Sequence, residues 1–329
     1  MNGNTKKVAE DNGSLATLFF PREEKTHASR RSVLYGSFWV VSSKAYGFYV
    51  SLSPKLKAMD SLTQIDIKAV LEQKAPKAAR RIPGWVVAYL AKTIHQTELN
   101  EILSLYRDRQ GVDFMRSMVD YFDLRFELIH AERIPQTGRF LFASNHPLGG
   151  LDGICLSTLI GNLFQDKIYY LVNDLLLHIP NLRSIFIPIN KHGAQSRETA
   201  LQMEQAYASD RQIITFPAGL CSRKIDGQIQ DLEWKKSFIQ KAVAYQRDII
   251  PIYFDGRNSH FFYNFARIRK ALGIRMNYEM IYLPDEMFKS KHQTFRVYFG
   301  EPIPWQTFDE RRTPAEWANW VRAIVYHLK

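Results

Sequence analysis

The sequence predicts an α/β fold in which a central mixed sheet is flanked by helices and preceded by an N-terminal helical region. Short β-rich runs alternate with helical stretches from Arg125 onward, and this alternation is typical of a sheet with helices packed on its faces. Before Arg125, apolar residues recur at spacings of three and four, which indicates helices. Of the 329 residues, 46% are hydrophobic, which is enough to build a sizeable core.

Residues 1–58 form a polar lead without a sustained period, which we interpret as flexible or poorly specified. Its most apolar stretch, 33–52, contains Lys44 and several Ser and Gly residues, and falls short of the roughly 20 apolar residues of a spanning helix. That stretch also lies too far behind a polar run to be a secretory signal. Because the amphipathic pattern begins just after Met59, we hypothesise that Met59 is the true start.

Residues 59–124 are expected to form a helical region that docks on a membrane. Within it, an apolar helix at 83–92 carries Trp85 and Tyr89 and follows a short basic run. The basic residues are Lys77, Arg80 and Arg81. This combination is typical of a helix that lies on an anionic lipid surface. The alternative is that the same helix packs on the protein core.

Residues 125–329 form the predicted α/β domain. Its strands are expected at 125–130, 139–144, 167–172, 185–189, 211–216, 248–254 and 295–299. Its helices are expected near 151–163, 194–208, 235–245, 261–272 and 314–328.

The charge and cysteine content restrict the partners and the compartment. A formal net charge of +11 favours an anionic partner, such as nucleic acid, an anionic membrane surface, or an acidic carrier or substrate. Two cysteines, Cys155 and Cys221, exclude a disulfide scaffold and indicate a reduced compartment. We expect Cys221 to be a packing residue. The spacing of the histidines with cysteines and acids predicts no metal site.

The most informative segment is the run 144–153, which lies between an apolar strand and a helical pattern. Ligands bind at this end of a strand in α/β sheets. His146 can act as a general base near neutral pH, and a carboxylate such as Asp152 can fix its tautomer. Pro147 and the pair Gly149 and Gly150 supply the bends that fold Asp152 back toward His146. The alternative is a loop histidine beside an ordinary helix N-cap.

Three further motifs follow in order, each at the end of a strand. One run, 186–191, ends in Lys191, and the turn 216–223 ends in Arg223. A third, apolar strand is interrupted by Pro251. Together with the His and Asp motif, these four ordered features resemble the glycerolipid acyltransferase superfamily of lysophosphatidate-type, PlsC-like enzymes.

The resemblance implies a role for each matching residue. His146 would be the general base and Asp152 its orienting partner, so that the acceptor hydroxyl attacks an acyl thioester without a covalent acyl-enzyme. Lys191 and Arg223 would lie near the acceptor's anionic group, Gly219 would allow close backbone approach, and Pro251 would shape the wall. The substrate-binding residues implied are Asn145, Gly149, Gly150, Lys191, Phe216, Pro217, Gly219, Arg223 and Pro251.

The resemblance also implies the partners. The donor would be acyl carrier protein or acyl coenzyme A, with no cofactor and no metal, and the acceptor a lyso-lipid. The enzyme would work peripherally on the cytoplasmic face of the inner membrane, and no nucleic acid is expected.

Departures from the family pattern concern the acceptor. Five residues separate His146 from Asp152 where the family has four, Ala218 stands where the family has Glu, and Lys191 where it has Arg. The variant motif resembles the bacterial branch that O-acylates lyso-aminolipids, the monoacylated glycine and ornithine lipids. Three alternatives stay open: a 1-acyl-sn-glycerol-3-phosphate acyltransferase, a thioesterase, and a non-enzymatic protein that binds anionic lipid or nucleic acid.

Overall fold

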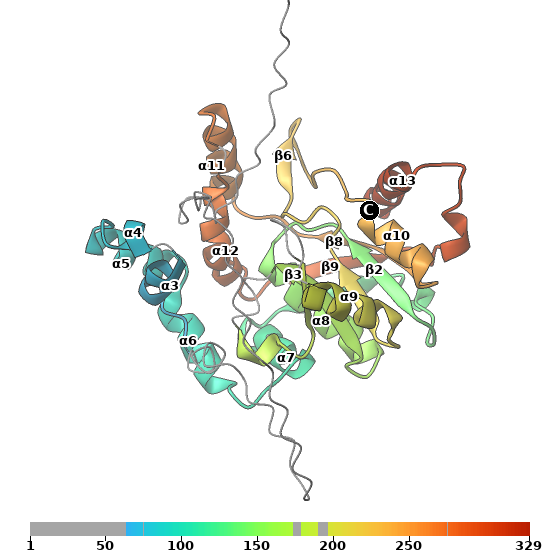
Figure 1. Ribbon diagram of the computed structural model, residues 1–329, viewed down its shortest axis with the longest axis horizontal. Coiled ribbons are helices and arrows are strands. Elements are labelled where there is room, and N and C mark those ends of the chain that lie inside the picture. Colours follow the sequence, from blue (N-terminus) through green and yellow to red (C-terminus); the bar gives the residue numbers. More distant parts are fainter. Residues whose placement is uncertain (1–63, 75, 174–178, 190–196, 275) are drawn as a thin grey trace, which may run out of the picture.

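The computed structural model is built around one seven-stranded mixed sheet (Figure 1). The structure describes residues 64–74, 76–173, 179–189, 197–274 and 276–329. The predicted lead at 1–58 therefore lies outside the described residues.

The strands of the sheet confirm the prediction from the sequence. They are β1 (Arg125–Ile129), β2 (Phe140–Ser144), β3 (Ile168–Asn173), β4 (Phe186–Ile189), β5 (Gln212–Thr215), β8 (Asp248–Asp255) and β9 (Thr294–Phe299). Their order in the sheet is β1-β9-β8-β2-β5-β3-β4. Strands β8, β2, β5, β3 and β4 run parallel, and β9 pairs antiparallel with β8 and parallel with β1. The carboxyl ends of β2, β5 and β8 thus meet at one edge.

Strand β2, in the middle of the sheet, shows why the core has two halves. Phe140 and Phe142 face one hydrophobic cluster, whereas Leu141 and Ala143 face the other. A parallel strand that is buried on both faces is mostly apolar, and β2 is apolar from Phe140 to Ala143.

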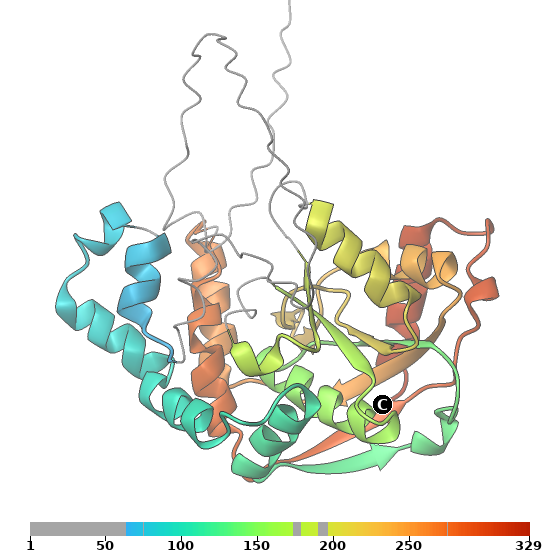
Figure 2. The same ribbon diagram turned by 60° about the horizontal axis from the view of Figure 1, so that its bottom comes forward.

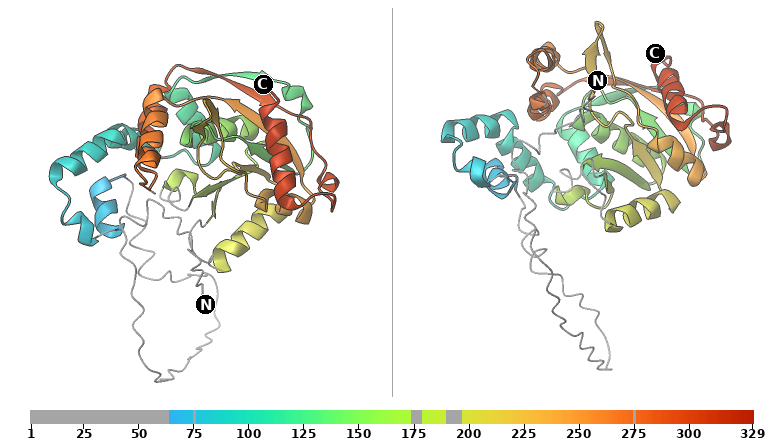
Figure 3. Two further views of the ribbon diagram at one scale, coloured as in Figure 1. Left: turned by 90° about the horizontal axis from the view of Figure 1, so that it is seen from above. Right: turned by 45° about the horizontal axis from the view of Figure 1, so that its top comes forward.

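Helices cover both faces of the sheet (Figure 3). The first cluster includes side chains of α7 (Val112–Tyr121) and α8 (Gly150–Leu163). The second includes side chains of α9 (Arg197–Ala208), α10 (Ser237–Ala244) and α13 (Pro314–Tyr326). The helices predicted in the α/β domain are thereby confirmed, together with α11 (His260–Ala271).

Several short elements of the described α/β domain were not predicted, and two of them are joined through Arg223 and Glu279. One is the small hairpin of β6 (Arg223–Ile225) and β7 (Gln228–Gln230), whose strands are short and polar. The other is a 3-10 helix, η4 (Tyr278–Tyr282), that continues into α12 (Leu283–Lys289). Each of these two helices is shorter than the window over which helical periodicity is detectable.

The N-terminal helices stand at one side of the sheet (Figure 2). They are α3 (Ile67–Lys74), α4 (Pro76–Ala79), α5 (Gly84–Thr93) and α6 (Gln96–Leu105). Helix α5 contacts η4, where the hydroxyls of Tyr89 and Tyr282 lie 2.6 Å apart. Within the described ranges, no helix has the length and apolar character needed to cross a bilayer.

The contact between α7 and α8 provides a test of the packing. A Cβ added at Gly161 would lie 2.4 Å from Cγ1 of Val112, so Gly161→Ala is expected to destabilise the fold by about 1–3 kcal/mol, despite alanine's higher helix propensity. Urea unfolding measures this loss. Val112→Ala should cost less in the Gly161→Ala background than in the wild type, because it removes the clash. Equal stability of Gly161→Ala and wild type would contradict this packing.

Candidate active site

The loops that follow β2 and β5 meet at the carboxyl edge of the sheet and are joined by hydrogen bonds. The Ser222 N–H, in the segment after β5, donates to the carbonyl of His146 at 2.7 Å. The His146 N–H donates to Oδ1 of Asp231 at 3.1 Å. His146 therefore has its backbone fixed on both sides by the segment that follows β5.

The structure brings the side chains of His146 and Asp152 together. The imidazole Nδ1 lies 3.1 Å from Oδ2 and 3.0 Å from Oδ1 of a carboxylate with no exposed surface. The Leu148 N–H donates to the same Oδ2 at 2.9 Å. Asp152 lies in the first turn of α8, where the helix dipole also favours a negative charge. The carboxylate thus orders the loop backbone and orients the imidazole at once.

Gly149 makes the five-residue spacing between His146 and Asp152 possible. It adopts φ +74° and ψ −116° immediately before α8, a conformation that glycine tolerates. A Cβ at this position would also lie 2.8 Å from Leu283. At Gly150, by contrast, a Cβ would meet no atom within 4 Å. The need for glycine is therefore specific to Gly149.

The imidazole of His146 is backed by an aromatic ring. Phe216 stacks on it with ring centroids 4.1 Å apart, and Tyr170 meets the edge of Phe216. Within the part of the chain that the structure describes, Nε2 has no hydrogen-bond partner. An imidazole held at Nδ1 and unpaired at Nε2 is able to take a proton from a hydroxyl that approaches it.

Asp231 is a site residue that the sequence analysis missed. Besides the His146 N–H, it accepts hydrogen bonds from Oγ of Ser222 at 2.6 Å and from Nε1 of Trp234 at 2.9 Å. Burial raises the pKa of this carboxyl, although these donors act in the opposite direction. It lies 85 residues after His146 in a polar loop that matches no motif, so no pattern in the sequence points to it.

Arg223 is engaged by an acid that the sequence analysis also missed. Its guanidinium donates to Glu279 at 2.9 Å, and Glu279 is fully buried in η4. The same carboxylate accepts from Arg269 of α11 at 2.7 Å. One carboxylate thus lies between two guanidinium groups, and the cluster of Arg223, Glu279 and Arg269 keeps one net positive charge.

The remaining residues predicted to bind substrate lie in different environments. Asn145 uses its amide to pair with both backbone polar groups of Phe254, at 2.7 and 3.0 Å. Gly219 has φ +68°, and its N–H donates to the carbonyl of Phe216 to close a turn. The Pro217 carbonyl accepts from the Lys235 N–H at 3.0 Å.

Pro251 is not brought to His146 by the described structure. Pro251 alternates along β8 with the residues of the first core cluster, and its ring lies against Gly300. It therefore occupies the sheet face covered by α10 and α13, opposite α8. Lys191 lies outside the described residues.

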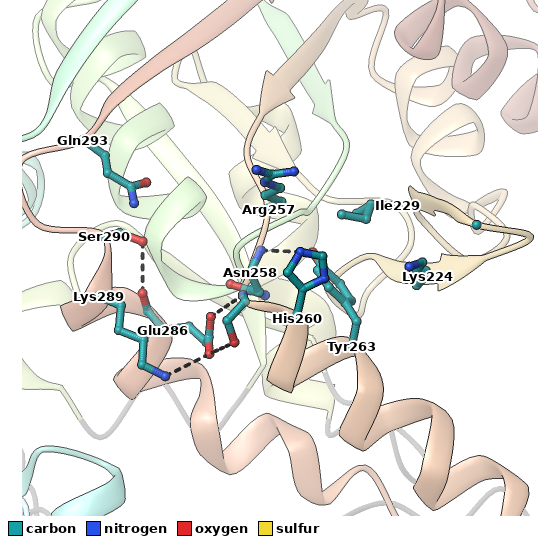
Figure 4. Close-up of a pocket in the computed structure, with 12 residues that line it drawn as sticks. Lys224, Ile229, Arg257, Asn258, His260, Tyr263, Glu286, Lys289, Ser290 and Gln293 are labelled. Atoms are coloured by element: carbon teal, nitrogen blue, oxygen red, sulfur yellow. Dashed lines mark hydrogen bonds and ion pairs between the residues drawn. The ribbon is translucent and has the colours of Figure 1, made fainter.

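Two cavities open beside the β6–β7 hairpin. One, of about 440 Å³, lies between the β6–β7 hairpin, the start of α11 and the end of α12 (Figure 4). Its buried acid, Glu286, accepts hydrogen bonds from the N–H and hydroxyl of Ser259, both at 2.6 Å. The other, of about 680 Å³, is lined by Asn145 and Pro147, which flank His146 in sequence. His146 itself lines neither cavity.

Both cysteines of the described chain are buried free thiols. Burial raises the pKa of the Cys221 thiol to about 11, which makes it a poor nucleophile at neutral pH. Cys155 is also fully buried. No group of three or more His, Cys, Asp and Glu side chains is arranged to hold a metal ion among the residues that the structure describes.

Known proteins match this chain over most of its length. A family model described as acyltransferase matches residues 69–329. A lyso-glycine lipid O-acyltransferase of Bacteroides thetaiotaomicron is 50% identical over 82% of this chain and 99% of its own length. One of the same name from Phocaeicola vulgatus is 49% identical over 82% of this chain and 96% of its own. The crystal structure of the 1-acyl-sn-glycerophosphate acyltransferase PlsC from Thermotoga maritima aligns over 74% of this chain and 88% of its own, with 15% identity and a TM-score of 0.39.

Replacement of the buried carboxyl at Asp231 is expected to change how stability depends on pH. Because the folded protein raises the pKa of Asp231, the contribution of this residue to the free energy of unfolding should fall as pH rises from about 4 through that raised value. Asp231→Asn lacks this titration. At about pH 4 the variant should be less stable by about 1–3 kcal/mol, because the amide nitrogen that replaces Oδ2 cannot accept from Trp234, and the gap should narrow at higher pH.

Urea unfolding at a series of pH values measures this gap. Asp226→Asn, which removes an exposed acid in the β6–β7 turn, is the matched control and should leave the pH dependence as it is in the wild type. A gap between wild type and Asp231→Asn that widens with pH would contradict the assignment.

Proposed function

Since the chain belongs to the acyltransferase family and is an acyltransferase, we propose that it moves a fatty acyl group from an acyl thioester to the hydroxyl of a monoacylated glycine lipid, with His146 as general base. The acceptor class is supported by two relatives named lyso-glycine lipid O-acyltransferase, which match nearly their whole length at 49–50% identity. The observation that carries the catalytic role is the pairing of Nδ1 with the buried Asp152, which leaves Nε2 unpaired among the described residues.

The reaction that we propose needs no covalent acyl-enzyme. Nε2 of His146 takes the proton of the acceptor hydroxyl as its oxygen attacks the thioester carbonyl carbon. The ester C–O bond forms, the C–S bond breaks, and the imidazolium returns the proton to the leaving thiolate. Asp152 keeps Nδ1 protonated and stabilises the imidazolium while it exists.

The charge near Arg223 supports an acceptor with a single negative charge. The cluster of Arg223, Glu279 and Arg269 has one net positive charge, which balances one carboxylate. A phosphate monoester carries about −1.5 to −2 charges at neutral pH, and would leave charge unbalanced here. We therefore propose that the carboxylate of the glycine headgroup binds on the side of Arg223, with acyl carrier protein or coenzyme A as the donor's thiol carrier.

Loss of the imidazole base should remove acyl transfer while the fold survives. His146→Ala and His146→Gln are each expected to lower kcat/KM at least about 100-fold, the usual scale for a general base. Gln is included because its amide can still donate to Asp152, which keeps the buried carboxylate paired. Transfer of a labelled acyl chain is measured alongside the melting temperature. His327→Ala, at an exposed histidine near the C-terminus, is the matched control. A folded His146→Gln enzyme with more than a tenth of wild-type activity would rule out the general-base role.

Acceptor choice discriminates the proposed reaction from its rivals. With one acyl thioester donor, the enzyme should form product with monoacylated glycine lipid and little with lysophosphatidate, because the cluster around Arg223 balances one negative charge. Chromatography of the products, with acyl carrier protein and coenzyme A donors in parallel, measures this preference. Preferred acylation of lysophosphatidate would contradict the proposed acceptor, and acyl release in the absence of any acceptor would indicate a thioesterase.

A further inference from the structure

Helix α11 has an apolar side that faces the core and a second apolar side that does not. Phe262, Tyr263 and Ala266 are buried. Residues at spacings of four, three and four form another stripe along the helix. This apolar stripe consists of Phe261, Phe265, Ile268 and Leu272, of which Phe261 is 48%, Ile268 54% and Leu272 70% exposed. An exposed run of large apolar side chains on one helix face indicates a surface that contacts something else.

The apolar stripe continues onto the N-terminal helices. The rings of Phe261 and Phe265 both meet Tyr282 edge-on, at centroid distances of 5.0 and 5.7 Å. The hydroxyl of Tyr282 in turn bonds that of Tyr89 on α5. On the same helix, Trp85 is 74% exposed. Figure 2 shows α11 beside the N-terminal helices, so residues almost 200 positions apart in sequence contribute to one surface.

Unpaired cations accompany this surface. Arg267 and Lys270 are exposed on α11, and Arg80 and Arg81 are exposed just before α5. Within the described ranges, none of these four side chains forms an ion pair with an acid. Trp and Tyr with adjacent Lys and Arg are the residues that favour the interface between a bilayer and water.

The surface also adjoins the candidate active site. Leu283, the residue after Tyr282, lies against Gly149 of the loop that holds His146. Glu279, at the same 3-10 helix, pairs with Arg223. A lipid that enters from this surface would therefore meet the loop of His146 and the guanidinium of Arg223 first.

The sequence already predicts that the helix with Trp85 and Tyr89 lies on an anionic lipid surface. We propose that α11 is a second docking element for the same bilayer, with the apolar stripe inserted among the lipid headgroups beside α5. The inference draws on the proposed function only in that a lipid acceptor resides in such a bilayer. A second copy of the chain fits this surface less well, because a two-fold contact brings each cation of the patch toward its own counterpart. Anionic headgroups instead complement those cations.

Vesicle binding by the full-length chain tests the proposal without any substrate. The wild type should bind vesicles of phosphatidylcholine and phosphatidylglycerol more tightly than vesicles of phosphatidylcholine alone. Ile268→Gln with Leu272→Gln should weaken that binding about tenfold or more. The variant lacks two apolar side chains whose transfer from water into the bilayer favours binding. Leu201→Gln, at a similarly exposed leucine of α9, is the matched control and should bind like the wild type. Arg267→Gln with Lys270→Gln should remove most of the preference for anionic vesicles.

Two outcomes would overturn the proposal. One is unchanged vesicle binding by the stripe variant. The other is a wild-type dimer that the stripe variant converts to a monomer in light scattering, which would assign the surface to a second copy. Failure of this proposal can be distinguished from failure of the proposed function. His146→Gln should bind vesicles like the wild type, and the stripe variant should retain acyl transfer to detergent-dispersed acceptor.

Discussion

A single buried carboxylate, that of Asp152, is the interaction on which the candidate site depends. A carboxylate removed from water is costly unless hydrogen-bond donors surround it. Here the donors are the Leu148 N–H and Nδ1 of His146, with the amino end of α8 adding its dipole. Both donors bond Oδ2, whereas Oδ1 is buried without a hydrogen-bond partner among the described residues. The bonds to Oδ2 shape the loop and aim the imidazole in the same step. Gly149 is the residue that lets the backbone reach this arrangement across five intervening positions.

The site also depends on a second segment, the one that follows β5. Parallel pairing of β2 with β5 places the segments after both strands at one edge, where Phe216 stacks on the imidazole and Asp231 holds the His146 backbone. Asp231 also binds Ser222 and Trp234, so the turn after β5 cannot shift without disturbing the loop after β2. The sheet register thus fixes the relative position of the base and the turn that backs it.

Features with local periodicity were predictable from the sequence, and features formed between distant segments were not. Short β-rich runs identified the strands of the sheet, and the run 144–153 identified His146 and Asp152 because both lie within one short segment. Asp231 and Glu279 were not predicted, because each contacts its partners only in the folded protein. Both lie in short polar segments without a recurrent spacing. The exposed apolar stripe of α11 was not predicted for a related reason. A sequence pattern shows which residues are apolar but not which side of a helix the core covers.

The bond between Asp231 and the His146 backbone sets a rule for building chimeras with related enzymes. A transplant that carried only β2, its loop and α8 would bring the imidazole and its carboxylate but leave behind the acceptor of the His146 N–H and the ring that backs it. That orphaned N–H would have to find water or a new partner, and the loop would lose its fixed position. Segment exchange between homologues should therefore move the stretch from Phe216 to Trp234 together with the β2 loop. The two segments are far apart in the chain but have to be exchanged as one unit.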